Sequence, residues 1–175
     1  MRSVWPLVLI VCAACGRAAD PESEEISSDA TCRFTATTTL AEAAKVEGAA
    51  GYQVLPNGLR LHLEAAGFLA VFGSTAVTGP ETGQYTVQVG SLVWHPSEGA
   101  GLRAQADTRG PDAELGSLRV KSVEDGLVRG EVKMELTSES GDPITVSAEF
   151  EALPGHVADT GSAFSTCLAR IATPS

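Results

Sequence analysis

Basic residues and aromatic residues are both scarce in this sequence. Lys and Arg total 12 against 22 Asp and Glu, for a formal net charge of −10, and only 5% of the 175 residues are aromatic. Binding to nucleic acid depends on basic side chains that displace counterions from phosphates, and no basic cluster interrupts the acidic background. The composition therefore predicts no nucleic-acid partner and is typical of a surface that stays soluble in a crowded compartment.

Long apolar runs are absent as well. The run at residues 4–14 has 11 residues, whereas a membrane-spanning helix needs about 20. Arg2 precedes this run, and the small residues Ala13 and Ala14 close it. A positive charge, an apolar stretch and then small residues form the order of a secretory signal. Residues 1–14 are therefore predicted to be an export signal that is removed.

The end of this signal contains Cys12 and Cys15 in C-x-x-C spacing, but no strand–helix unit of the kind that activates a redox pair surrounds them. Ala13, Ala14 and Cys15 instead resemble the lipobox of bacterial lipoproteins, although Cys12 stands where that family usually has leucine. The resemblance implies that Cys15 is fatty-acylated, becomes the new N-terminus and anchors the protein in the bacterial cell envelope. By the sorting rule of that family, Gly16 rather than Asp after Cys15 implies the outer membrane. Plain secretion by an ordinary signal peptide is the alternative.

Two further regions follow the signal. Residues 15–29 hold the cysteine predicted to be acylated and then five acidic residues, one Arg and one Pro, with almost no bulky apolar side chain. Such a segment cannot bury enough surface to offset the entropy of ordering it, and it is predicted to be a flexible tether. Residues 30–175 are long enough for a single domain with a sizeable core.

Apolar and polar residues alternate through most of this domain. The clearest runs are residues 59–64, 85–89, 131–136 and 144–150. Alternation predicts strands with one buried and one water-facing side, as in antiparallel sheets. Turn residues such as Asn57-Gly58 and Asp125-Gly126 separate the runs and leave no room for crossover helices. The predicted fold is all-β, an antiparallel meander of about eight to ten strands that forms a β-sandwich or barrel.

The alternation also assigns side chains to the core. Glu131, Lys133 and Glu135 are expected to face water, whereas the residues expected to share one core are Val132, Met134, Leu136, Ile144, Val146 and Phe150.

Residues 39–48 fit two patterns. Thr39 and Glu42 make a capping box for a short helix that Gly48 would end, while Ala44 and Val46 also fit a strand. Both alternatives stay open at the level of sequence.

From about residue 44 to residue 152 the chain resembles small bacterial envelope proteins of β structure. Residues 44–48 match the element A-x-V-[DE]-G, residues 57–61 match N-G-L-x-L, and residues 83–85 match G-x-Y. Residues 116–150 correspond to the closing meander of those proteins. The resemblance implies a fold type and no activity.

One tetrapeptide suggests catalysis. Residues 159–162 read D-T-G-S, like the active site of aspartic proteases, which need two such aspartates facing one another. This chain has one copy, with only 13 residues after Ser162. A loop that happens to have this sequence is the better interpretation, and no aspartic-protease activity is predicted for Asp159.

Other motifs for catalysis, cofactors or metals are missing. His62, His95 and His156 lack the spacing of metal ligands and are expected at the surface. No phosphate-binding loop, dinucleotide motif, nucleophile elbow or calcium loop is present. Trp94 fits either a core position or the rim of a ligand site. The sequence thus predicts no enzyme, no cofactor and no bound metal.

Two cysteines remain once Cys12 is removed and Cys15 is acylated. Cys32 alternates with apolar residues at the start of the domain, and Cys167 lies near its end. In an oxidising envelope such a pair is expected to form a disulfide, with two buried free cysteines as the alternative.

Together these features predict a non-enzymatic cell-envelope lipoprotein, a binding or structural domain tethered to the membrane, with an unknown protein or glycan as partner. A lipocalin-like carrier of an apolar ligand is the alternative, because apolar residues such as those at 68–72 could either fill a core or line a cavity.

Overall fold

The computed structural model describes residues 31–40, 45–56, 58–74, 79–95, 101–105, 114–155, 164–165 and 167. Within them lie ten strands: β1 (Arg33–Thr38), β2 (Lys45–Leu55), β3 (Gly58–Ala65), β4 (Phe68–Ser74), β5 (Gly83–Val87), β6 (Val89–Trp94), β7 (Leu102–Gln105), β8 (Gly116–Glu124), β9 (Leu127–Ser138) and β10 (Pro143–Pro154). The all-β prediction is confirmed.

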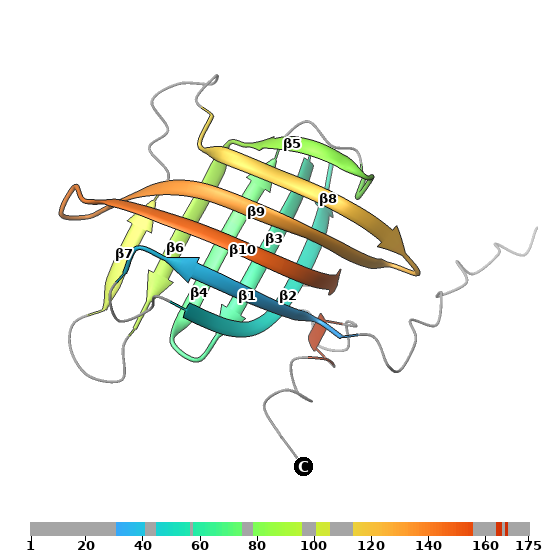
Figure 1. Cartoon of the computed structure of the whole chain (residues 1–175), viewed down its shortest axis with the longest axis horizontal. Helices are drawn as coiled ribbons and strands as arrows, with labels where there is room; N and C mark the ends of the chain where they lie inside the picture. Colours follow the sequence, from blue (N-terminus) through green and yellow to red (C-terminus); the bar gives the residue numbers. More distant parts are fainter. Residues whose placement is uncertain are drawn as a thin grey trace, which may run out of the picture.

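The strands form one sheet that closes on itself. Their order is β1-β10-β2-β3-β4-β6-β7-β9-β8-β5, and additional pairings join β1 to β2 and β10 to β9, so that the sheet closes in a ring. Neighbouring strands are antiparallel except where the end of β10 runs parallel to β2. Figure 1 shows two layers whose strands cross, with β1, β10, β9, β8 and β5 in front and β3, β4, β6 and β7 behind; β2 curves from beside β1 into the back layer.

Two hairpins appear where turn residues predicted them. Leu55 pairs with Gly58, so that β2 and β3 are joined by a tight connection. Glu124 pairs with Leu127 across the other hairpin. The two residues between them, Asp125 and Gly126, have φ angles of 48° and 74°. Positive φ at both positions is the geometry of the tight turn that best matches the twist of paired strands.

Of the two alternatives for residues 39–48, the strand is confirmed for residues 45–48. They belong to β2, where Val46 pairs with Ala36 and Gly48 pairs with Phe34 of β1. Pairing with a strand supplies hydrogen bonds along the whole segment, which outweigh the local advantage of a helix cap.

The interior of the ring is filled by side chains that point inward from both layers. The six residues assigned to one core between 132 and 150 are all at most 5% exposed, while Lys133 and Glu135 are exposed. That prediction is confirmed. The rings of Phe34 and Phe68 stack with their centroids 6.0 Å apart. Other large members of this core are Leu61, Leu63, Phe72, Leu92, Leu118 and Phe150.

A second, smaller core lies beside the first. It contains the Cys32–Cys167 disulfide, the pair expected from the sequence. Phe164 belongs to this cluster and is fully buried. A Cβ atom on Gly51 would lie 2.7 Å from the Phe164 ring, and this close approach requires glycine there. The remaining members are Ala49, Leu127 and Leu153.

The prediction that His62 lies at the surface is wrong. His62 alternates with the inward leucines of β3, yet only 2% of it is exposed. Its cross-strand partner is Gly51, where Phe164 packs, so an additional layer covers this outer side of the sheet. His95 is exposed as expected, and His156 lies outside the described residues. Trp94 is half-buried and packs against the main core.

Candidate functional site

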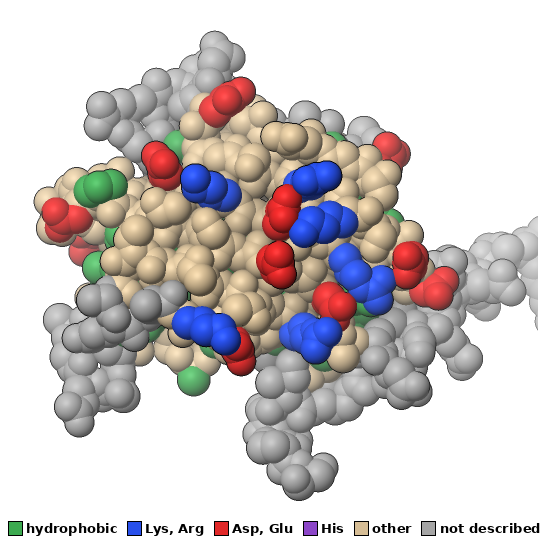
Figure 2. Space-filling view, in the orientation of Figure 1, with side chains coloured by type: hydrophobic (Ala, Val, Ile, Leu, Met, Phe, Trp, Pro, Cys, Tyr) green, Lys and Arg blue, Asp and Glu red, His purple; other side chains and the backbone are tan. Residues whose placement is uncertain are grey.

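The outward side chains of the front layer form a broad polar surface, here called the front face. Because side chains alternate along a strand, every second residue of β1, β10, β9, β8 and β5 points away from the core. Figure 2 shows acidic and basic groups interspersed over this face. Its principal residues are Arg33, Thr35 and Thr37; Thr145, Ser147, Glu149 and Glu151; Arg129, Glu131, Lys133 and Glu135; Ser117, Arg119, Lys121 and Glu124; and Gln84 and Thr86.

One ion-pair network crosses four strands of this face. The register places Arg33, Glu151 and Arg129 side by side on β1, β10 and β9. Glu151 accepts hydrogen bonds from the Thr31 hydroxyl, from Arg33 Nε at 3.1 Å and from Arg129 Nε at 3.2 Å. Arg129 also donates to Glu124 of β8 at 2.9 Å. Sheet register thus brings together Arg33 and Glu151, which are 118 positions apart in sequence.

These contacts shift the proton affinities of the network. The hydrogen bond from Thr31 lowers the pKa of Glu151, as do the hydrogen bond from Arg129 and the charges of Arg33 and Arg129, although partial burial of Glu151 acts in the opposite direction. Hydrogen bonds to Glu124 and Glu151 raise the pKa of Arg129. Both groups therefore stay charged at neutral pH.

A second network lies one pleat further along the strands. Lys121 Nζ is 2.8 Å from Glu131 and 4.0 Å from Glu149, and Arg119 is 3.5 Å from Glu131. The hydrogen bond and charge of Lys121 lower the pKa of Glu131. These side chains are between 41% and 81% exposed. Exposed pairs of this kind add little to stability, so their arrangement matters more for what the surface can contact.

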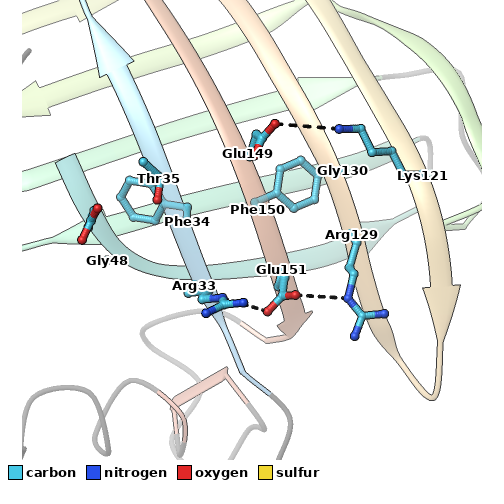
Figure 3. A pocket seen from close by; sticks show the side chains of 11 residues that line it. Arg33, Phe34, Thr35, Gly48, Lys121, Arg129, Gly130, Glu149, Phe150 and Glu151 are labelled. Carbon is cyan, nitrogen blue, oxygen red and sulfur yellow. Dashed lines mark hydrogen bonds and ion pairs between the residues drawn. The ribbon is translucent and has the colours of Figure 1, made fainter. Parts of the chain in front are cut away.

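Grooves run between these rows of charges. The first has a volume of about 730 Å³. As Figure 3 shows, Arg33, Glu151 and Arg129 lie along one side of it and Glu149 and Lys121 along the other. Its floor is made by the buried residues Phe34, Gly130 and Phe150.

A second groove, of about 540 Å³, follows on the same face. Its lining is rich in hydroxyls and charges, with Val132 and Ala148 beneath. The other residues along it include Thr35, Thr37, Gln84, Ser117, Lys133 and Ser147. A third groove of about 320 Å³ lies between Ser117 and Glu135. Each groove separates two rows of outward side chains, so the face consists of alternating ridges and furrows.

The charged groups of the front face are arranged in ion pairs and hydrogen-bonded networks. Within the described ranges, no group of three or more His, Cys, Asp or Glu side chains is arranged to hold a metal ion. The carboxylates of the front face with shifted proton affinity, Glu131 and Glu151, have lowered pKa values, whereas a general acid at neutral pH needs a raised one. Asp159 and Cys15 lie outside the described residues.

The front face was missed at the level of sequence. Alternation assigned Glu131, Lys133 and Glu135 to water but did not indicate that they share a face with β1 and β8. One signal was available, namely the change of charge sign at every second residue from Arg129 to Glu135. Such a pattern marks an ordered polar side of a strand.

Comparisons with protein-family models, with curated proteins and with solved structures yield no significant match to this chain. Across the part of the chain that the structure describes, there is no helix long and apolar enough to cross a membrane.

Proposed function

We propose that this chain is a non-enzymatic cell-envelope lipoprotein. In this proposal residues 1–14 are removed, acylated Cys15 anchors the protein in the outer membrane, and residues 15–29 tether the domain of residues 30–175. The domain acts through contacts with another macromolecule, a protein or a glycan, and uses no cofactor. The lipobox-like sequence supports the anchor, and an acidic chain of net charge −10 disfavours nucleic acid.

One observation carries the binding role: the interior is filled, whereas the front face is furrowed and polar. Aromatic and aliphatic side chains occupy the centre of the ring, so the alternative of an apolar-ligand carrier gains no support from the packing. Outside, grooves of about 730 and 540 Å³ lie between rows of charged and hydroxyl side chains held on paired strands. A rigid sheet that presents ordered polar groups is suited to specific contact.

The anchor is tested by metabolic labelling with a fatty acid. Cys15→Ser should abolish the label, because the acylated thiol is gone, whereas the matched variant Cys12→Leu should keep it. A label that persists in Cys15→Ser would refute the anchor assignment.

The binding role is tested by photo-crosslinking in cells, with a photoreactive residue at Ser147 on the front face or at Arg60, an exposed position on β3 of the back layer. Discrete adducts should form from Ser147 and not from Arg60. Equal yields from both positions would contradict the proposal. Saturable binding of a fluorescent fatty acid would instead favour the carrier.

A further inference from the structure

The charges along β9 form a series that is complementary to its own reverse. Its outward residues are Arg129, Glu131, Lys133 and Glu135, so the sign changes at each step. Read in the opposite direction, every position carries the opposite sign. Two β9 strands stacked face to face and antiparallel would therefore place Arg129 on Glu135 and Glu131 on Lys133, four favourable pairs in all by symmetry.

Half of this series already has partners within the chain. Arg129 pairs with Glu124 and Glu151, whereas Lys133 and Glu135 have no ion-pair partner among the residues that the structure describes. The antiparallel stack offers Lys133 the Glu131 carboxylate of a second copy, and offers Glu135 the guanidinium of the opposing Arg129. The unpaired half of one face thus meets the paired half of the other.

The neighbouring strands tolerate the same arrangement. The register places Glu149 beside Glu131 and Ser147 beside Lys133. When Glu131 of one copy faces Lys133 of the other, Glu149 therefore faces Ser147 of the second copy. On the other side of β9, Arg119 lies beside Glu131 and Ser117 lies beside Lys133, so Arg119 faces Ser117 of the second copy. No described like charges are superposed in this register, which removes the repulsion that usually prevents charged faces from self-association.

Evenly spaced rows of side chains allow two such sheets to face each other row on row. Successive outward residues on a strand are about 7 Å apart, and a second copy has the same spacing, so the charged rows of one face come opposite those of the other. A simple anion is a poorer occupant of the first groove, because its three basic residues, Arg33, Lys121 and Arg129, are balanced by Glu47, Glu149 and Glu151.

From these observations we infer that the front face binds the front face of a second copy of this chain, with the two β9 strands antiparallel. The two-fold axis then runs across the strands, so that β1 of one copy lies over β1 of the other. Since β1 is at one end of the front layer, the two β1 strands lie along the same edge of the dimer, with their first residues toward opposite ends of that edge (Figure 1). This geometry suits two anchors in one membrane, a point that rests on the proposed function, and tethering raises the local concentration of a weakly associating pair.

Charge-swap variants test the inference. In Lys133→Glu, each copy would set Glu131 against a new glutamate of its partner, and in Glu131→Lys each would set Lys133 against a new lysine. Each variant alone should associate about tenfold more weakly than the wild type, since favourable pairs become repulsive. An equimolar mixture restores every opposite-charge pair and should recover wild-type association. Arg60→Glu, on the back layer, is the matched control and should associate like the wild type.

The measurement is sedimentation velocity of the full chain as isolated from cells, in nonionic detergent where it is acylated. Wild-type association should weaken at about 0.5 M salt, where charges are screened within a few ångströms. A wild type that stays monomeric, or a mixture that associates no better than either variant alone, would overturn the inference. A wild type that takes up no fatty-acid label would refute the proposed lipid anchor but would not affect the sedimentation result. Failure of the anchor and failure of the dimer are therefore distinguishable.

Discussion

Replacing both Cys32 and Cys167 with alanine tests what holds the two ends of the domain together. The disulfide joins residues 135 positions apart, and both cysteines are at most 3% exposed. It also lies in the small core with Phe164, so its removal affects both the unfolded chain and the packing of that core. We expect a large loss of stability from this double substitution.

The magnitude follows from the loop that the bridge closes. A cross-link over 135 residues restricts the unfolded chain by about 5 kcal/mol in the chain-entropy description. Domains of this size are stable by only about 5 to 15 kcal/mol in total. Strain or residual structure in the unfolded chain reduces such effects, and the expected loss in the free energy of unfolding is therefore about 3 to 5 kcal/mol.

Urea unfolding of a chain that begins at Gly16 measures this loss, because such a chain contains no other cysteine. The reductant-treated wild type is the matched control and should lose a similar amount, while the double alanine variant should not respond to reductant. A change of less than about 1 kcal/mol in both would refute the reasoning, since it would mean that the bridge restricts neither the unfolded chain nor the small core.

Two further predictions concern the core and the front face. Val146→Asp would place an unpaired charge at a fully buried position, and should lower the free energy of unfolding by several kcal/mol; a urea midpoint like that of wild type would show that the inward side of β10 is wrongly assigned. The pKa of Glu151 is lowered below 4.5, so its ionised form stabilises the fold above that pH and the stabilisation is lost as the pH falls through the lowered value. Glu151→Gln should therefore be less stable than wild type by about 1 kcal/mol at pH 7, with the difference vanishing in acid; a constant difference across the pH range would contradict this account.

The strands and their buried sides were predictable because alternation is a local property. In β9 and β10, each apolar residue assigned to the core is buried, and the register simply aligns the two alternating series. The turn between β8 and β9 was also predictable from the sequence, since Asp125-Gly126 suits the left-handed backbone of a tight turn. These features need no knowledge of distant parts of the chain.

The front face could not be predicted in the same way. Its first network joins Arg33 to Glu151, 118 positions away, and only the ring-shaped pairing of the strands brings them together. Alternation indicates that both side chains are exposed to solvent, but it does not indicate that they lie on the same surface of the domain. Which polar residues become neighbours is decided by strand order, and strand order depends on many weak non-local contacts.

The error at His62 has the same origin, and Gly51 explains it. The outer side of β2 carries Ala49 and Gly51, whose small size leaves room for a further layer above the sheet. Phe164 fills that room, three residues before Cys167, which is bonded to Cys32 at the start of β1. The disulfide therefore does more than join the ends of the domain: it holds Phe164 against Gly51 and turns part of the outer side of the sheet into a second core. His62, paired with Gly51 on β3, is buried because this side of the sheet is no longer a surface.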